Sequence, residues 1–496
     1  MVQPGELKRA TGLDVYEASV VEATGATYFL ARRGGRKLVG CAGGPCLPNV
    51  EKLGEIGGKC VCAGPTDPAN AAAIRTALPW TAPKCLALAT SVGLGDRLGL
   101  ATPGHIRAVR GRGLAAVLAQ QSIREMTRTQ RTPQQVMDCA TWGVLQEHFT
   151  DGFGADADHL QHPQDIDSTV AAGFTMFTID PGLHVANEAD ALDPAALAEK
   201  LADLDFETLA ASTKDLKKRY VGKRFALQGG GKVEFDEQVL LRAAVKYGSA
   251  IAHTVKMYRH LKQAARGAFE LEVSVDETES PTSPAEHYFF AAELKRLGVE
   301  WVSMAPRFVG RFEKGVDYIG DLDAFRASFA EHVAVMRTVG PYKMSIHSGS
   351  DKFSIYPIVT EAAEGLVHLK TAGTSYLEAV RAIAGIEPGL FREILDFARE
   401  RYETDKATYH VSADVSKVPP AGSLNDGELA GLLDQFDARQ VLHVTFGSVL
   451  TADGGERFRR RMYAALERDE QAHYAALARH LGRHVEPLAA GGRHRA

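Results

Sequence analysis

Short runs of hydrophobic residues alternate with longer stretches of helical periodicity along most of the chain beyond about residue 80. The runs that we expect to form strands are Gly113–Ala119, Gly152–Asp156, Phe174–Ile179, Phe269–Val275, Glu300–Ala305, Lys343–His347, Leu366–Thr371 and Val441–Phe446, with Thr408–Val411 as a candidate to replace one of them. The expected helices are Pro194–Leu204, Phe235–Arg266, Ala285–Leu297, Asp323–Val339, Tyr376–Ala384 and Pro388–Tyr402. Because strands that alternate with helices form parallel βαβ units, eight in succession predict an α/β fold with a closed, TIM-type (β/α)8 barrel over residues 81–487.

An open, doubly wound sheet is the alternative arrangement of the same elements. A glycine-rich phosphate loop that opens a helix would favour it, but the nearest candidate, Gly93-Leu94-Gly95-Asp96, lacks the full fingerprint. The segment between Ile179 and Phe269 is too long for one crossover. We therefore expect a helical insertion at about residues 180–265.

The two ends of the chain differ from the predicted barrel. In residues 1–80, short β-like runs are separated by glycine pairs, which is typical of hairpins and predicts an N-terminal β-rich lobe. Its four cysteines include a Cys-X-Cys pair, Cys60 and Cys62, which is not the usual Cys-X2-Cys spacing of a zinc knuckle, so ordinary buried thiols are favoured. Residues 488–496 are rich in Gly, Arg and His and are predicted to be disordered.

Composition excludes several classes of partner. The chain has 496 residues, 24% charged residues and a formal net charge of −5, and it has no long basic run. Phosphate binding needs clustered Lys and Arg, so nucleic acid is not an expected partner. No apolar stretch approaches the roughly 18 residues of a membrane span, and no secretory signal follows Met1. We therefore expect a cytoplasmic protein without a membrane partner, and a homo-oligomer is compatible with the sequence.

Polar residues at the ends of the predicted strands are the candidates for chemistry, because barrel enzymes build their sites at the carboxyl ends of the strands. Asp158 and His159 follow one strand and His347 ends another. Imidazoles are good ligands for divalent metals, and a neighbouring carboxylate can act as a general base. Three carboxylates, Asp276, Glu277 and Glu279, follow a third strand, where crowding of acids can raise one pKa into the range of a proton donor.

Two further strand ends carry basic residues. His368 and Lys370 are two positions apart and therefore share one face of their strand, which we expect to point into the barrel. Arg307 ends another strand and suits a carboxylate by its bidentate geometry. We expect Arg307 or Lys370 to hold an anionic substrate group, assisted by the turn that runs from Ser348 to Asp351.

Several long strings resemble those of the tagaturonate epimerase family. They are Gly154–His159, Val275–Glu279, Phe308–Gly315, Ile346–Lys352 and Leu369–Tyr376, within a resemblance that spans about residues 80–485. The resemblance implies a metal-dependent isomerase that interconverts D-tagaturonate and D-fructuronate without a nicotinamide. It further implies Asp158 as proton acceptor, His159 and His347 as metal ligands, and a carboxylate of residues 276–279, most simply Glu277, as proton donor.

The third metal ligand is chosen on chemistry rather than on the resemblance. We expect His368, with Glu313 and His410 as open alternatives. Three imidazole ligands with open positions suit Zn, Mn, Fe, Co or Ni. A weaker, local likeness to class II fructose-bisphosphate aldolases rests on an adjacent Asp-His and a later His turn. A metal aldolase acting on a sugar acid, or a sugar-acid-binding barrel without catalysis, therefore remains the alternative function.

Overall fold

A closed barrel of eight parallel strands forms the centre of the protein, as the sequence predicts. The computed structural model describes residues 2–44 and 46–492. In the order in which they pair, the strands are β7 (Ser91–Leu94), β8 (Ala115–Ser122), β9 (Phe153–Leu160), β10 (Met176–Ile179), β13 (Glu270–Val275), β14 (Ser303–Pro306), β15 (Lys343–Ile346) and β16 (Val367–Thr371), which closes onto β7. The doubly wound alternative is therefore wrong.

One of the eight predicted strands is wrong. Val441–Phe446 is helical, and the missing strand is β7, which includes part of the segment considered as a phosphate loop. Residues 437–444 of the helix that covers Val441 are all buried, and Val441, Leu442 and Val444 form a short apolar run that periodicity alone cannot distinguish from a strand. In β7, Gly93 interrupts what would otherwise be a hydrophobic run. A larger residue does not fit at this position, because a Cβ on Gly93 would lie 1.9 Å from Oε1 of Gln120.

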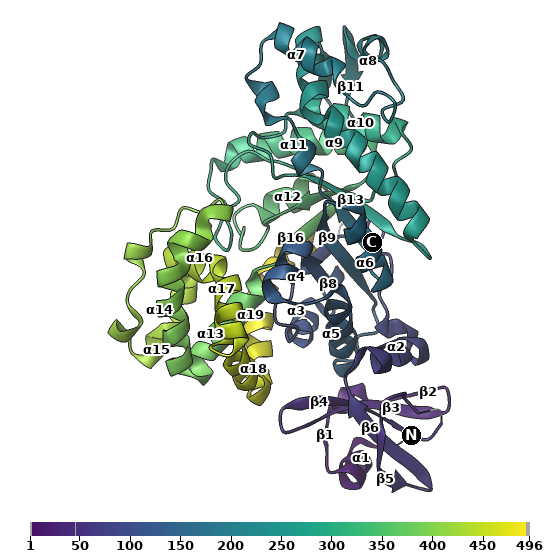
Figure 1. The fold of residues 1–496 in the computed structure, drawn as a ribbon, viewed down its shortest axis with the longest axis vertical. Coiled ribbons are helices and arrows are strands. Elements are labelled where there is room, and N and C mark those ends of the chain that lie inside the picture. The colour runs from purple at the N-terminus through teal and green to yellow at the C-terminus, as the bar shows by residue number, and fades with distance from the viewer. Residues whose placement is uncertain (1, 45, 493–496) are drawn as a thin grey trace.

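Helices that follow the strands cover the outside of the barrel (Figure 1). They are α3 (Thr102–Val109), α4 (Ile123–Thr129), α5 (Pro133–Gln146), α6 (Pro163–Ala171), α10 (Pro284–Arg296), α11 (Leu322–Val339) and α12 (Tyr356–Ala362). The main core lies between these helices and the barrel strands, with residues such as Phe153, Phe177 and Phe329 buried in it. Six helices predicted from periodicity are present with ends within three residues of the prediction.

The insertion between β10 and β13 is mixed rather than purely helical. It contains α7 (Pro194–Ala202), α8 (Thr213–Tyr220), the hairpin β11 (Lys223–Ala226) and β12 (Lys232–Phe235), and the long helix α9 (Glu237–Ala264). In Figure 1 α7, α8 and β11 lie at the end of the molecule opposite the N-terminal sheet. The glycine-rich segment 229–231 forms the turn of the hairpin, with positive φ at all three glycines.

The N-terminal segment forms an antiparallel sheet that lies apart from the barrel strands (Figure 1). Its strands pair in the order β1-β3-β4-β6-β5, with β2 added to β3. After α1 (Pro4–Thr11), the strands are β1 (Asp14–Val15), β2 (Val21–Ala23), β3 (Ala26–Arg33), β4 (Arg36–Ala42), β5 (Glu51–Ile56) and β6 (Lys59–Pro65), followed by α2 (Pro68–Ala77). One face of the sheet packs against α2 and α5 through Tyr28, Leu30, Ile74 and Trp142.

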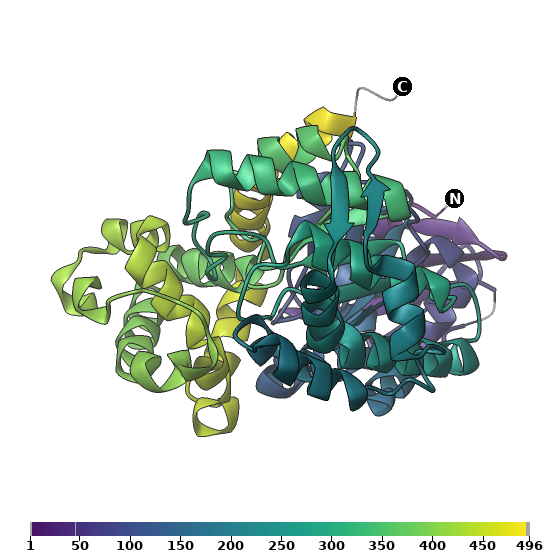
Figure 2. The same ribbon diagram turned by 90° about the horizontal axis from the view of Figure 1, so that it is seen from above.

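Beyond β16 the chain forms a helical unit beside the barrel, seen in green and yellow in Figure 2. Its helices are α13 (Thr374–Ile386), α14 (Pro388–Asp405), α15 (Asp426–Leu429), α16 (Phe436–Val444), α17 (Phe446–Thr451), α18 (Arg459–Arg468) and α19 (Glu470–Gly492). Helices α13 to α18 enclose a second hydrophobic core, whereas Leu477, Leu481 and Val485 of α19 are buried in the main core. Helix α19 includes residues 488–492 of the tail expected to be disordered, and residues 493–496 lie outside the described residues. Among the described helices, none is long and apolar enough to cross a membrane.

Replacing Phe446 with Ala should destabilise the helical unit strongly. Its ring is fully buried in the second core and stacks under the guanidinium of Arg97, 3.6 Å from the ring centroid. Loss of a buried Phe side chain costs about 3–5 kcal/mol, and urea unfolding followed by circular dichroism would measure the change. Phe436→Ala is the matched control, because that ring is 37% exposed and its removal should cost much less. Equal losses would contradict this assignment of the core.

Candidate active site at the mouth of the barrel

Acidic and basic side chains share the interior of the barrel near the carboxyl ends of its strands. Asp156 and Asp158 lie on one face of β9, Glu272 lies on β13, and Lys370 lies on β16. All four are buried. Because side chains alternate along a strand, residues two apart such as Asp156 and Asp158 point the same way, which fixes both carboxylates inside the barrel.

A β-bulge at the end of β9 brings two adjacent residues to the same opening. The pairing with β10 slips by one residue between the pairs Ala157–Phe177 and Leu160–Ile179. Within the slip, His159 has a φ of 54°, in the left-handed region that residues other than glycine rarely adopt. A regular strand would send Asp158 and His159 to opposite faces, whereas both line the cavity at the barrel mouth.

Lys370 is the centre of the buried charges. Its Nζ lies 2.8 Å from Oδ2 of Asp156, 2.7 Å from Oδ1 of Asp158 and 2.7 Å from Oε1 of Glu272, and it donates to Oγ1 of Thr178 at 2.7 Å. Burial by itself lowers the pKa of the ammonium group, but the three carboxylates raise it well above its ordinary value. The lysine therefore stays charged and neutralises part of the acidic cluster.

His159, Asp276 and His347 converge above this lysine. Each offers one ligand atom, and the three atoms lie within 4.8 Å of one another. The two imidazole rings are 5.0 Å apart between centroids, and Nδ1 of His347 lies 3.2 Å from Oδ1 of Asp276. Two imidazoles and a carboxylate form a donor set that suits a divalent transition metal, so the residues present fit the ion that the sequence implies.

Carboxylates also orient both imidazoles from behind. Nδ1 of His159 lies 3.2 Å from Oδ2 of Asp180, and Nε2 of His347 lies 2.6 Å from Oε1 of Glu272. Burial lowers the pKa of each ring, but nearby carboxylates, above all Asp158 for His159 and Asp276 for His347, raise it to about 10 and about 9 respectively. Carboxylates behind imidazoles are typical of metal sites, where the metal displaces the ring proton.

The expected third ligand, His368, lies elsewhere. It faces into the barrel, as expected, but two residues deeper than Lys370, where its Nδ1 lies 2.9 Å from Oγ of Ser91. Its Nε2 has no hydrogen-bond partner among the described residues, and burial lowers the pKa of the ring to about 3. Asp276 occupies the position beside the two imidazoles instead. Of the alternatives, Glu313 accepts hydrogen bonds from Ser412, and His410 lies on the cavity wall.

The remaining predicted site residues separate into two groups. Glu277, Arg307, Ser348 and Lys370 line the cavity, and Glu277 forms an ion pair with Arg124 at 3.0 Å. Asp351 does not line it, because its carboxylate is buried 2.9 Å from Arg439 and 2.5 Å from His480. The sequence prediction missed Asp156, Asp180 and Glu272, although a glutamate in the middle of the hydrophobic run 269–275 was a signal for the last of them.

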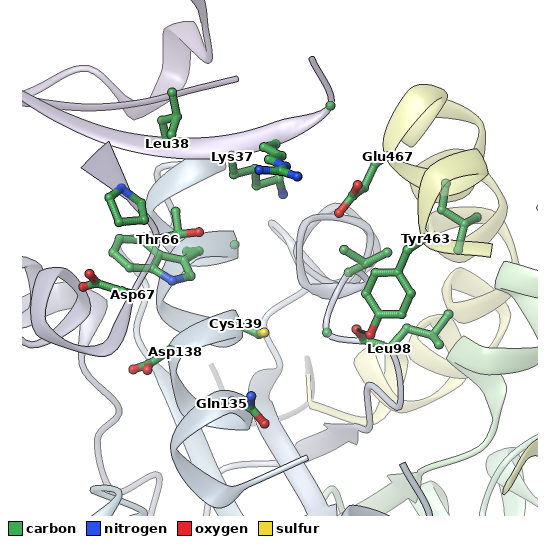
Figure 3. Close-up of a pocket in the computed structure, with 18 of the residues that line it drawn as sticks. Lys37, Leu38, Thr66, Asp67, Leu98, Gln135, Asp138, Cys139, Tyr463 and Glu467 are labelled. Carbon is green, nitrogen blue, oxygen red and sulfur yellow. Dashed lines mark hydrogen bonds between the residues drawn. The ribbon is translucent and has the colours of Figure 1, made fainter. Parts of the chain in front are cut away.

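The described part of the protein has two large cavities, and the smaller one is lined by the acids and imidazoles described above. It has a volume of about 420 Å³ and lies at the barrel mouth. A larger cavity of about 1330 Å³ lies between the N-terminal sheet, α5 and α18, where Figure 3 shows Lys37, Cys139 and Glu467 on its walls. There Lys37 already donates to Gln146 and Tyr474. We take the smaller cavity as the reaction site, because it combines acids, imidazoles and cations.

A closed (β/α)8 barrel with acids and imidazoles in its mouth defines the protein as a barrel enzyme by fold and site. The family model of the tagaturonate epimerases (UxaE) matches residues 16–488, and the chain belongs to this family. The resemblance seen in the sequence is thereby confirmed. The family and its relatives are epimerases, so the isomerase class expected from the sequence is confirmed as well.

Two relatives extend the comparison. The tagaturonate/fructuronate epimerase of Thermotoga maritima is 43% identical over 479 residues, covering 96% of this chain and 97% of the relative. The crystal structure of the fructuronate-tagaturonate epimerase UxaE from Cohnella laeviribosi, complexed with one glycerol, is 38% identical, covers 96% of both chains and superimposes with a TM-score of 0.90. A native crystal structure of the same protein gives the same TM-score and coverage.

Replacing Lys370 with Met should destabilise the fold because it leaves three carboxylates buried without their cation. Breaking a buried ion pair in this way costs about 3–5 kcal/mol, measurable by urea unfolding at neutral pH. Lys370 holds the pKa of Asp158 well below its ordinary value, so the contribution of the Asp158–Lys370 pair is complete above about pH 4 and shrinks as the pH falls further.

Lys256→Met is the control for this variant. Lys256 and Asp205 are 2.7 Å apart, the same separation as Lys370 and Asp158, but the lysine side chain is 60% exposed. Exposed pairs contribute at most about 1 kcal/mol. A Lys370 variant that loses no more stability than the Lys256 variant would show that the central lysine does not balance the acidic cluster.

Proposed function

We propose that this chain interconverts D-tagaturonate and D-fructuronate by inverting the configuration at C4. The observation that carries the proposal is the group of Asp158, His159, Asp276 and His347, which meets in one cavity of suitable size for a six-carbon sugar acid. The proposal is supported by the relative from Thermotoga maritima, which is named for this reaction and matches nearly the whole chain.

The position of C4 limits the chemistry. The hydrogen on C4 is β to the C2 ketone and is therefore not acidic, so direct removal of this proton is a poor route. Cleavage of the C3–C4 bond by a retro-aldol step is better, because the electron pair then moves toward the ketone. Rotation of the aldehyde fragment and renewed bond formation from its other face would complete the inversion.

Asp158 is suited to accept the proton of the C4 hydroxyl group. Burial tends to raise its pKa, but Lys370, His159 and His347 hold the pKa well below its ordinary value, so the carboxylate is ionised at neutral pH. Glu277, on the wall of the same cavity, is the candidate to return a proton to the C4 oxygen. It would do so from its protonated form, which gives up the ion pair with Arg124, and proton exchange with solvent then restores both carboxyl groups. A second carboxylate at the cavity is useful because the oxygen of C4 faces a different direction after rotation.

The charges in the cavity indicate which side chains bind the carboxylate of the substrate. Lys370 is already engaged by three carboxylates, so Arg307 is the better partner for the carboxylate of the substrate. Lys314 also lines the cavity and donates to Oγ of Ser348 at 2.5 Å, which makes the turn after β15 more electropositive.

His159, Asp276 and His347 would hold a divalent metal such as Zn, Mn, Fe, Co or Ni. When bound, such an ion supplies Lewis-acid stabilisation of charge on substrate oxygens. The chain's own contribution is to keep the two imidazoles fixed through Asp180 and Glu272, so that Nε2 of His159 and Nδ1 of His347 remain for the ion beside Asp276. Asp276 replaces the expected His368 in this set.

An NMR experiment would test the reaction directly. Protein loaded with a divalent metal is incubated with tagaturonate in deuterated water, with and without a chelator. We expect fructuronate to form without deuterium at C4, and chelation to stop its formation. Deuterium at C4 would eliminate the retro-aldol route, and accumulation of free three-carbon fragments would identify an aldolase. Binding of tagaturonate without formation of either product would identify a sugar-acid-binding protein that is not an enzyme.

Variants should separate the proton acceptor from the metal ligands. Asp158→Asn should lower kcat by about 10²–10⁴ because the amide cannot accept a proton, while metal content remains. His159→Ala should lose both metal and activity. Asp151→Asn is the matched control, since this exposed residue precedes the same strand and should leave both readouts unchanged. Wild-type kcat in the Asp158 variant would refute its role as the base.

A further inference from the structure

One corner of the cavity at the barrel mouth lies where the loop after β7 meets the C-terminal helical unit. The cavity wall there is formed by Arg97 after β7, Ala372 and Gly373 after β16, and His443 of α16. The two loops are in direct contact, because a Cβ on Gly95 would lie 2.8 Å from Cα of Ala372. A Cβ on Gly373 would likewise lie 1.8 Å from Nε2 of His443. We call this region the Arg97 corner.

The guanidinium group of Arg97 is held on one side and unpartnered on the other. Its Nε donates to Oε1 of Glu125 at 2.8 Å, and its Nη2 lies 2.7 Å from the same oxygen. The ring of Phe446 packs against the group, 3.6 Å from ring centroid to Cζ. Nη1, by contrast, is buried and has no hydrogen-bond partner among the described residues, although Arg97 is only 4% exposed. Such a buried donor is unfavourable unless a ligand oxygen accepts its hydrogen bond.

Two further hydrogen-bond donors are available at the same corner. Nδ1 of His443 is buried and has no partner within the described chain. Burial and then nearby cations, first Arg97, hold the pKa of this imidazole well below its ordinary value, so the ring is neutral and carries one N–H group. Helix α13, of 13 residues, begins beside it with Gly373 at the N-cap and no side chain capping its first turn. The N–H groups at such a helix end attract anions.

The charge of the wall favours the same kind of ligand. Among the described residues, more Lys and Arg than Asp and Glu side chains line the cavity. Glu125 neutralises part of the charge of Arg97, but it leaves the Nη1 edge unoccupied. A guanidinium edge, an imidazole and a helix N-terminus together offer donors to one group. Carboxylate and phosphate oxygens are the acceptors that suit them.

We propose that the Arg97 corner is a second oxyanion subsite of the barrel mouth, which binds one carboxylate or phosphate group between Arg97, His443 and the N-terminus of α13. It is additional to Arg307, which follows β14 and is separated from the β7 loop by strands β15 and β16. Two sources of the oxyanion fit this chemistry. One is the carboxylate of a sugar acid whose acidic end points toward β7, which rests on the proposed function. The other is free phosphate, which does not.

Calorimetric titration of the full-length protein with inorganic phosphate and with D-tagaturonate tests the subsite. Each anion is added to metal-loaded protein and to protein with a chelator, so that binding to a metal ion is recognised separately. We expect Arg97→Met to weaken the binding of phosphate about tenfold or more, because a charge-assisted hydrogen bond is lost. Arg97→Lys keeps a positive charge beside Glu125 but lacks Nη1, so it should weaken phosphate binding in a protein that still folds.

Titration with D-tagatose distinguishes the two sources, because this ketohexose has a hydroxymethyl group in place of the carboxylate. If the carboxylate of the sugar acid occupies the Arg97 corner, Arg97→Lys should weaken the binding of tagaturonate about tenfold and leave that of tagatose unchanged. Phosphate should then compete with tagaturonate in the wild-type protein. If free phosphate alone occupies the corner, the variant should lose affinity for phosphate only.

Arg381→Met is the matched control. Nε of Arg381 donates to Glu378 at 2.8 Å, the same separation as between Arg97 and Glu125, but Arg381 lies outside the cavity. This variant should bind both anions as the wild type does. The subsite would be refuted if neither anion bound to the wild-type protein, or if both Arg97 variants bound both anions with unchanged affinity. Anion binding that depends on Arg97 without any formation of fructuronate would instead refute only the proposed function.

Discussion

One buried ammonium group allows the interior of this barrel to be acidic. Asp156, Asp158 and Glu272 all lie within 2.8 Å of Nζ of Lys370, inside a shell of hydrophobic side chains. Carboxylates so close together would repel one another and take up protons without a cation among them. With Lys370 present, Asp158 remains an anion, and the imidazoles of His159 and His347 lie beside fixed negative charges. The chemistry that we propose depends on this balance of charge.

Backbone geometry supplies the second condition. The bulge at the end of β9 turns both Asp158 and His159 to the mouth, and the left-handed φ of His159 is the local cost of that arrangement. Strained backbone of this kind persists where the surroundings fix it, and here Asp180 holds the ring from the next strand end. The base and a metal ligand can thus be neighbours in sequence and still share one cavity.

Elements outside the barrel also shape its mouth. Asp351, in the turn that follows His347, is held by Arg439 of α16 and His480 of α19. The buried ammonium group of Lys352 donates to the carbonyl oxygens of Glu313 and Val316, which joins the same turn to the loop after β14. The C-terminal helical unit therefore does more than add a second core. It positions two loops of the site from behind.

The sequence by itself determined the alternation of strands and helices, the closed barrel, and the strand ends that carry Asp158, His159 and His347, because side-chain period and strand polarity are local properties. Only the tertiary structure decided that β7 completes the barrel and that Val441 belongs to a helix, since a short apolar run is compatible with either a strand or a buried helix. It also decided that Asp276 rather than His368 joins the imidazoles. The depth of a side chain inside a barrel depends on the register of the strands. That register is fixed by residues that are far apart in the chain.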